Sequence, residues 1–150
     1  MTPRPLARLA VLIAFGLSAP AFAEPAAYSP AVTVTPLLQT QTDGAGRPLV
    51  YPATGTPEVT AVLVTIAPGR QTNWHKHPVP CLAYLLEGEV HVELPSGEVK
   101  IFKAGQAFAE VVDLLHNGRN PGPAPAKLVM FVVGTAGTPY AVKAPAPDAR

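Results

Sequence analysis

Two histidines separated by one residue, His75 and His77, are the first sign of chemistry in this 150-residue sequence. In extended chain, residues i and i+2 project to the same face, so both imidazoles can reach one point. Pro78 and Pro80 restrict the residues before them to extended backbone, which stiffens that arrangement. Two imidazoles on one face can bind a transition metal, but an H-x-H by itself does not distinguish a metal site from a polar surface.

Short apolar runs on both sides of the histidines predict β-strands. Nineteen prolines argue against long helices, because each removes a backbone donor and fixes φ. Pro95-Ser96-Gly97 suits a three-residue hairpin with glycine in the left-handed conformation. Together these features predict an all-β sandwich or barrel. The predicted strands cover residues 59–66, 82–86, 89–94, 98–101, 107–112 and 127–133.

The N-terminal segment has the form of a secretory signal peptide. Arg4 and Arg8 precede an apolar run over residues 9–17, and the small-residue site Ala21-Phe22-Ala23 follows. The apolar run is too short to span a bilayer. We therefore expect residues 1–23 to be removed before Glu24, and the mature protein to be periplasmic or secreted without a membrane contact.

The remainder of the chain divides into three predicted regions within one domain. Residues 24–57 contain six prolines and are expected to form an extended arm, with short strands at 31–35 and 48–51. Residues 58–134 are expected to form the barrel core. Residues 135–150 are a Pro/Ala-rich tail that we expect to be poorly ordered.

Composition and charge exclude several classes of protein. The chain is 48% hydrophobic, which is too apolar for a disordered protein, and its 14% charged residues are too few for a coiled coil. Eleven Lys and Arg against ten Asp and Glu leave no basic excess to neutralise a phosphate backbone, which excludes a typical nucleic-acid-binding protein.

The histidines also belong to a longer pattern of spacing, which consists of Gly69, His75, His77, Gly88, Gly105, His116 and Asn120. These residues match positions of the motifs G-x5-H-x-H-x3/4-E-x6-G and G-x5-P-x-G-x2-H-x3-N over about residues 69–120, so the sequence resembles the cupin superfamily. The resemblance implies a cupin-type jelly-roll β-barrel that holds one divalent transition metal ion, with His75, His77 and His116 as ligands.

The sequence departs from these motifs at three positions. Cys81 occupies the glutamate position, Val111 the proline position and Asp113 the glycine position. Loss of the two turn residues predicts a differently shaped strand connection but removes no ligand. The cysteine changes the chemistry, because a carboxylate suits manganese or iron whereas a soft thiolate favours copper or zinc.

Cys81 leaves two alternatives open. As a ligand, which is how we place it, it would complete a closed four-coordinate shell with the three imidazoles. Away from the metal it is a small buried hydrophobe, or it is linked to a tyrosine as in some thiol dioxygenases of the superfamily, and open positions remain for water, O₂ or a substrate. The metal stays open among Fe, Cu, Zn, Mn and Ni, because loading also depends on availability.

Three further side chains are candidates for the pocket around the metal. Trp74 adjoins His75 and could line the pocket mouth, and Glu110 could act as an acid behind the ligands. Tyr140 or Tyr84 could supply a tyrosine partner for Cys81. Asn120 matches a motif position and is expected to fix a loop through backbone hydrogen bonds.

These features lead to two hypotheses of function. The first is a mononuclear metal-dependent oxidoreductase, of dioxygenase type, that acts on a small molecule. The second is a non-catalytic periplasmic protein that binds or senses copper or zinc, with Cys81 as the fourth ligand. A sugar-type isomerase or lyase is a weaker third option, because Glu110 is the one candidate for acid–base chemistry. The resemblance also implies a homodimer that pairs barrel faces.

Overall fold

The computed structural model describes Ser29 and residues 31–147. The predicted signal peptide, residues 1–23, lies outside the described residues. The chain divides into two units at Pro36, and the second unit, from Leu37 onward, contains the fold described below. Over the described ranges, no helix has the length and apolar character needed to cross a membrane.

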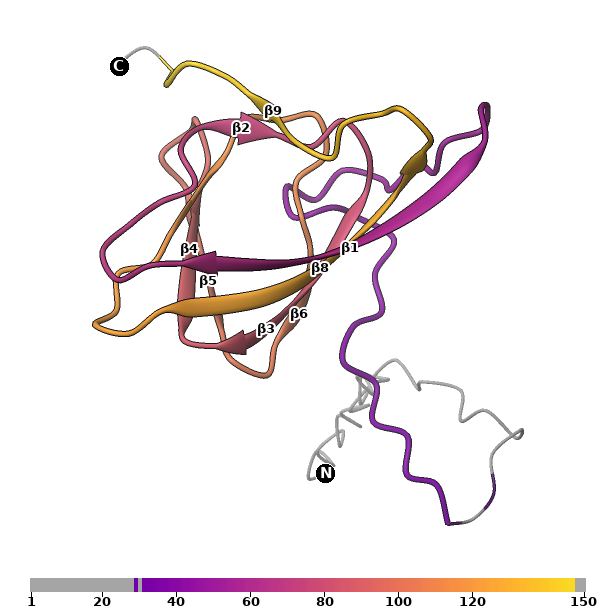
Figure 1. Cartoon of the computed structure of the whole chain (residues 1–150), viewed down its shortest axis with the longest axis horizontal. Helices are drawn as coiled ribbons and strands as arrows, with labels where there is room; N and C mark the ends of the chain where they lie inside the picture. The colour runs from indigo at the N-terminus through magenta and orange to yellow at the C-terminus, as the bar shows by residue number, and fades with distance from the viewer. Residues whose placement is uncertain (1–28, 30, 148–150) are drawn as a thin grey trace, which may run out of the picture. The chain divides into compact units, whose positions relative to one another are not determined.

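In the described part of the chain the second unit is all-β, with nine strands in antiparallel pairs (Figure 1). The sheets have the orders β1-β8-β3-β6, β5-β4-β7 and β2-β9 and enclose a common interior, which is a jelly-roll barrel. The prediction of an all-β jelly-roll is confirmed. The strand bounds are β1 (Pro57–Ile66), β2 (His75–Lys76), β3 (Cys81–Glu87), β4 (Glu89–Glu93), β5 (Val99–Lys103), β6 (Ala107–Ala109), β7 (Asn117–Arg119), β8 (Ala126–Thr135) and β9 (Val142–Lys143).

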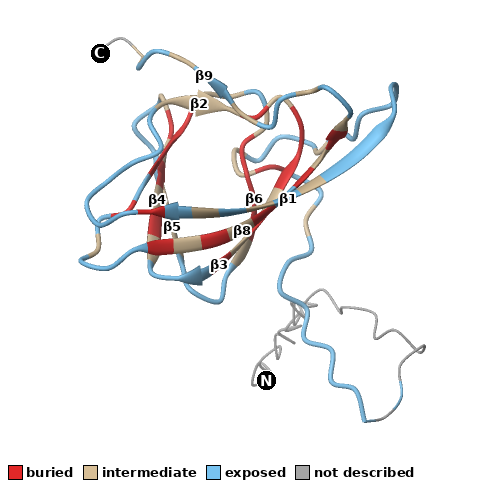
Figure 2. Cartoon of the chain, in the orientation of Figure 1, coloured by how far each residue is buried: buried red, intermediate tan, exposed pale blue. Residues whose placement is uncertain are grey.

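The longest strand pair, β1 with β8, shows why these residues form a barrel wall. Its register runs from Pro57 opposite Thr135 to Ile66 opposite Ala126 without a break. Burial along β8 alternates residue by residue, as Figure 2 shows, because successive side chains point to opposite faces of the sheet. One face of β8 therefore lines the interior, and the other is turned outward.

The hairpin between β4 and β5 forms where the sequence predicts it. Gly97 has a φ of 86°, a left-handed conformation that favours glycine, and its N–H donates to the Leu94 carbonyl at 2.9 Å. The Leu94 N–H donates to the Glu98 carbonyl at 2.9 Å and closes the turn. This turn fixes the register of the three-stranded sheet, in which Val90 and Val92 point inward.

Apolar side chains fill the interior at one end and form what we call the apolar core. Leu85 is completely buried there, and the rings of Phe102 and Phe108 stack with centroids 3.8 Å apart. Burial of each large apolar side chain contributes about 1.5–3 kcal/mol. The fully buried members are Ile66, Ala83, Leu85, Val90, Val92, Leu94, Phe108, Val111, Ala126 and Leu128.

Two buried polar side chains hold loops against the barrel. Asn120 donates to the carbonyls of Ile66 and Ala124 at 2.9 and 2.7 Å and accepts from the Gly122 N–H, so the expectation that it fixes a loop is confirmed. Asp43 accepts hydrogen bonds from backbone N–H groups of its own loop and from Val112 N at 3.1 Å. Both residues satisfy backbone donors or acceptors that no sheet pairs.

Segments near both ends of the described chain differ from the sequence expectation. The strands predicted at residues 31–35 and 48–51 do not form; one isolated bridge, Thr42 with Pro48, is found instead. The tail expected to be poorly ordered contains β9, which pairs with β2. The local sequence pattern gave the wrong prediction for both segments, because strand formation depends on a partner that lies far away in the sequence.

Candidate metal centre

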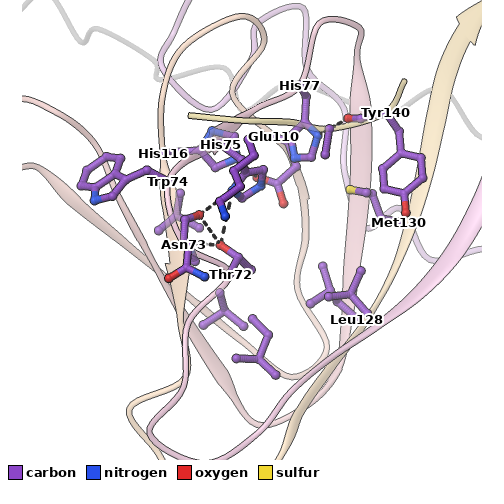
Figure 3. Close-up of a pocket in the computed structure, with 17 residues that line it drawn as sticks. Thr72, Asn73, Trp74, His75, His77, Glu110, His116, Leu128, Met130 and Tyr140 are labelled. Carbon is purple, nitrogen blue, oxygen red and sulfur yellow. Dashed lines mark hydrogen bonds and ion pairs between the residues drawn. The ribbon is translucent and has the colours of Figure 1, made fainter. Parts of the chain in front are cut away.

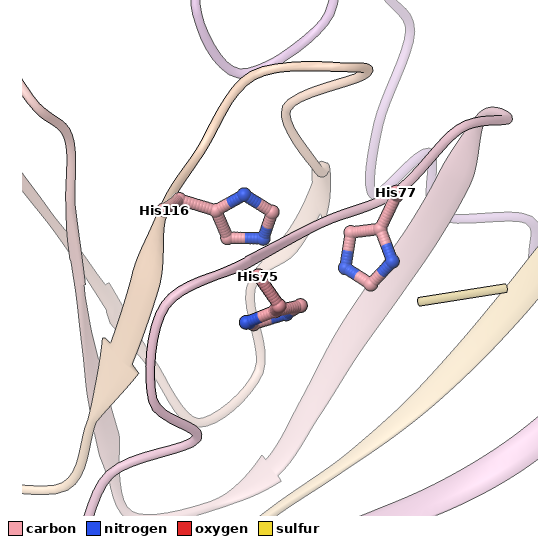
Figure 4. Close-up of side chains that lie close together, drawn as sticks. All are labelled: His75, His77 and His116. Atoms are coloured by element: carbon pink, nitrogen blue, oxygen red, sulfur yellow. The ribbon is translucent and has the colours of Figure 1, made fainter. Parts of the chain in front are cut away.

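The three histidines come together at the end of the barrel that β2 and β9 cross. The backbones of His75 and His116 exchange two hydrogen bonds of 3.0 and 2.9 Å, and the His77 carbonyl accepts from Asp113 N at 2.7 Å. The imidazole centroids lie between 4.4 and 5.0 Å apart, and the rings converge (Figure 4). One nitrogen of each ring lies within 4.8 Å of the other two, so the group could hold one metal ion.

Each imidazole is oriented by a hydrogen bond to a backbone carbonyl. The Nδ1 of His75 lies 2.8 Å from the Asn73 oxygen, that of His77 2.5 Å from the Tyr140 oxygen, and that of His116 3.0 Å from the Leu114 oxygen. A carbonyl can only accept, so each Nδ1 carries the proton in the neutral ring. The Nε2 lone pairs remain free to bind a metal, which is the usual arrangement of metal-ligating histidines.

The backbone turn before His75 places a carbonyl group where it can orient the His75 imidazole. Asn73 has a φ of 64°, in the left-handed region that asparagine tolerates better than most residues. The Asn73 carbonyl accepts from His75 Nδ1, and the neighbouring Thr72 N–H donates to the Gly118 carbonyl at 2.8 Å. The turn thus fixes the orientation of one imidazole from within its own segment.

Burial keeps two of the imidazoles neutral. It lowers the pKa of His77 to about 4 and that of His116 to about 3, because a charged ring is poorly solvated there. The nearby His75 lowers both pKa values further, while the carbonyl hydrogen bonds oppose the shift. Both rings are therefore unprotonated at neutral pH, as metal binding requires.

The histidines lie at the rim of a cavity of about 490 Å³ (Figure 3). Its walls below them are aliphatic, from residues such as Val64, Leu128 and Met130. Thr72, Asn73 and Lys143 add polar groups. A cavity of this size with apolar walls and a few convergent polar groups is typical of a site for a small molecule.

A family profile for the cupin domain matches residues 62–133, the segment that contains all three histidines. This part of the chain is a cupin domain. Residues 75, 77 and 116 of this cupin therefore occupy the positions that the motifs predict, and the structure brings them to one point.

Several solved structures are similar to this cupin. A protein with a double-stranded β-helix domain from Klebsiella pneumoniae is 25% identical, with a TM-score of 0.49 over 63% of this chain and 84% of that one. An oxalate oxidase is 24% identical, with a TM-score of 0.49, over 57% of this chain and 45% of its own. A Thermus thermophilus protein is 26% identical, with a TM-score of 0.46, over 57% and 81%. The chain thus spans less than half of the oxalate oxidase chain. A search of curated proteins gives no significant match.

The structure does not bring Cys81 to the histidines. Its side chain is completely buried in a second apolar cluster with Val79, Met130 and Val132, of which Met130 also lines the cavity, and its sulfur is 3.5 Å from the Val79 carbonyl. Burial, with a smaller contribution from the charge of Glu110, raises the pKa of the thiol to about 12. This packing corresponds to the alternative in which Cys81 is a small buried hydrophobe, and it gives no support to the prediction that Cys81 is a fourth ligand.

Glu110 is the acid that faces the cluster. Its side chain lines the cavity beside the histidines (Figure 3), and its Oε2 lies 3.9 Å from Nε2 of His116. The residue is 8% exposed, and burial raises the pKa of its carboxyl to about 7. Sequence reasoning named Glu110 as an acid behind the ligands, whereas the structure places it directly at the cavity.

Trp74 and Tyr140 both line the cavity, as expected from the sequence. Their backbone carbonyls, however, make the hydrogen bonds that hold the C-terminal strand and orient His77. The Trp74 carbonyl accepts from Ala144 N at 3.1 Å, and the Tyr140 carbonyl accepts from His77 Nδ1. The Tyr140 ring is 46% exposed, whereas Cys81 is fully buried in another cluster, so the pairing of these two side chains is not seen. The carbonyls of Asn73 and Leu114 were missed, because a carbonyl leaves no side-chain signal in a sequence.

Proposed function

We propose that this cupin is an exported metal-dependent oxidoreductase of dioxygenase type that acts on a small molecule. His75, His77 and His116 would hold one divalent transition metal ion at the rim of the cavity. The observation that carries the proposal is the set of three hydrogen bonds that occupy Nδ1 and leave each Nε2 lone pair free, on three rings that each bring one nitrogen within 4.8 Å of the other two.

The bound metal would supply Lewis acidity and a redox couple at the rim. The protein's own residues do the rest. The imidazoles of His77 and His116 stay neutral near pH 7, since burial depresses their pKa values. The aliphatic walls, with Val64 and Leu128 among them, exclude water from the body of the substrate.

The cavity supports a particular class of substrate. Its apolar depth fits a hydrocarbon or aromatic body, and the histidines lie where a polar end group would reach the metal. Lys143 lines the same cavity and is exposed, so it can attract an anionic group at the entrance. We therefore expect a small molecule with one oxygen- or sulfur-bearing polar end.

A non-catalytic copper or zinc protein has less support. That hypothesis relied on Cys81 as the fourth ligand, and Cys81 is packed among Val79, Met130 and Val132 instead. Three imidazoles without a thiolate leave positions at the metal for a substrate and O₂, as in catalytic rather than closed structural sites.

A homodimer is part of the proposal. Val59, Leu63 and Phe131 are 66%, 63% and 47% exposed on the outward face of the β1–β8 pair. Pairing this face with its copy would remove a contiguous apolar surface from water. Light scattering after size exclusion should give the mass of a dimer, and Phe131→Lys should give a monomer. A monomeric wild-type protein would contradict this part.

The function is tested by metal content and by turnover. The protein, exported natively and purified without a metal-affinity column, should hold close to one equivalent of a transition metal by elemental analysis. His77→Ala should lose that metal, whereas His91→Ala should keep it, because His91 pairs with Glu89 at 2.6 Å on the hairpin.

Oxygen consumption should then be measured with thiols, flavonols and diketones. The wild type and His91→Ala should consume oxygen with at least one class, and His77→Ala should not. Full metal content without turnover in any metal form would reject the oxidoreductase and leave a metal-binding cupin.

A further inference from the structure

Glu110 has an unusual environment for a carboxylate. It is 8% exposed, and within the described residues no hydrogen bond reaches its side-chain oxygens. Its backbone is fixed on both sides, because its N–H donates to the Cys81 carbonyl at 2.8 Å and its carbonyl accepts from Gly44 N at 3.3 Å. The backbone of Glu110 is therefore held in place, while its carboxylate faces the cavity without a hydrogen-bonding partner among the described residues.

The imidazole of His116, next to the Glu110 carboxylate, also has a polar atom without a hydrogen-bond partner. Nε2 of His116 is buried and has no hydrogen-bond partner in the described structure. Its ring proton is on Nδ1, which donates to the Leu114 carbonyl, so Nε2 presents a lone pair. Two lone-pair atoms thus face each other at 3.9 Å, which is too long for a hydrogen bond between them.

A metal ion between the two atoms would satisfy both. Typical distances from a metal to imidazole nitrogen and to carboxylate oxygen are about 2.0–2.2 Å, so two ligands of one ion lie up to about 4.3 Å apart. The observed 3.9 Å falls within that limit. We propose that Glu110 is the fourth protein ligand of the metal, an inference that rests on the three-histidine site proposed above.

The register of β3 and β6 relates this ligand to the cysteine. Leu82 lies opposite Ala109 at the end of β6, and just beyond that pair the Glu110 N–H donates to the Cys81 carbonyl at 2.8 Å. The carboxylate would therefore reach the metal from the segment that follows β6, beside Cys81. An oxygen ligand in place of sulfur favours manganese or iron over copper.

The experiment compares the wild type, Glu110→Gln and Cys81→Ser as purified, metal-free proteins titrated with Mn²⁺. Glutamine keeps the shape and removes the charge, and Cys81→Ser is the matched control beside it. We expect Glu110→Gln to weaken Mn²⁺ binding about 100-fold, the scale found for groups that support metal sites, and Cys81→Ser to change it less than about threefold.

Water-proton relaxation of the Mn²⁺-loaded proteins gives a second readout. If Glu110 binds the ion, the Glu110→Gln protein should carry one more exchangeable water than the wild type, and Cys81→Ser should carry the same number. Thermal melts of the metal-free variants test whether each is folded. If Glu110→Gln does not fold, the infrared carboxylate bands of the wild type should still shift when Mn²⁺ is added.

The outcomes separate this inference from the proposed function. Equal affinity and equal hydration in wild type and Glu110→Gln, with His77→Ala still defective, would reject Glu110 as a ligand and keep the three-histidine site. Failure of the infrared bands to shift in the loaded wild type would also reject it. A wild type that binds neither Mn²⁺ nor any other divalent transition metal would overturn both.

Discussion

The two ends of the barrel interior bury side chains of opposite character. At one end Leu85 and Phe108 are 0% and 5% exposed within the apolar core, where burial is favourable in itself. At the other end His116 and Glu110 are almost as deeply buried, at 2% and 8%, and Nε2 of His116 has no hydrogen-bond partner in the described structure. Such a group costs about 1–3 kcal/mol. The apolar core therefore stabilises the fold, whereas the histidine end is built to receive an ion.

The largest effect on stability should come from the apolar core. Leu85→Ala leaves a cavity in the packed interior and should lower the free energy of unfolding by about 3 kcal/mol. The matched control is Leu63→Ala, because Leu63 is 63% exposed on the outer face. Denaturant melts of metal-free protein should show less than about 0.5 kcal/mol for the control. Equal losses in the two variants would contradict the assignment of the core.

Metal removal should affect the histidine end alone. At a free metal concentration about 100 times the Kd, bound metal adds about 2.7 kcal/mol to the stability of the folded protein. A chelator should therefore lower the Tm of the wild type and of His91→Ala but leave that of His77→Ala unchanged. A chelator that lowers all three equally acts at some other site.

The loop beside Glu110 should have an intermediate effect. Asp43 accepts from the N–H groups of Ala45, Arg47 and Val112, and the Arg47 side chain bonds both Asp43 and the Val112 carbonyl. Asp43→Ala would leave buried donors unpaired, so we expect a loss of about 2 kcal/mol in denaturant melts. Arg47 is half exposed, so Arg47→Ala should lose less.

The pH dependence of this loss has a defined sign. Burial tends to raise the pKa of Asp43, but hydrogen bonds from Arg47, Val112 and Ala45 outweigh it and leave the pKa below the ordinary value of 3.8. The ionised carboxylate therefore stabilises the fold above about pH 4, and this contribution disappears as the pH falls through the lowered pKa. The gap between wild type and Asp43→Ala should be constant near neutral pH and should narrow below about pH 4.

The smallest effect should come from the C-terminal strand. Deletion of residues 138–150 removes β9 and the Tyr140 carbonyl that accepts from His77 Nδ1. We expect metal affinity to fall about tenfold, as for other lost partners of ligating histidines. Tyr140→Phe is the control and should keep full affinity, because the bond uses the backbone oxygen. Loss of affinity in Tyr140→Phe would assign the role to the phenol instead.

The two ends also differ in how well the sequence predicts them. Strands such as 59–66 and 127–133 follow from local alternation, and the hairpin at Gly97 follows from turn chemistry. His75, His77 and His116 follow from motif spacing, and the structure groups them.

Long-range pairing explains what the sequence could not predict. β9 is two residues long and exists only because it meets β2, which is far away in the chain. Likewise, the inactive role of Cys81 and the cavity position of Glu110 depend on which strands lie side by side. Neither residue carries a local signal that separates a ligand from a buried neighbour.

The most direct test of the metal centre is X-ray absorption spectroscopy of the metal-loaded wild-type protein. Three imidazoles from His75, His77 and His116 should give nitrogen scattering with the multiple-scattering pattern of the rings, together with oxygen at about 2.0–2.2 Å and no sulfur. A sulfur shell at about 2.3 Å would place Cys81 on the metal and contradict the account, and so would a spectrum without imidazole scattering.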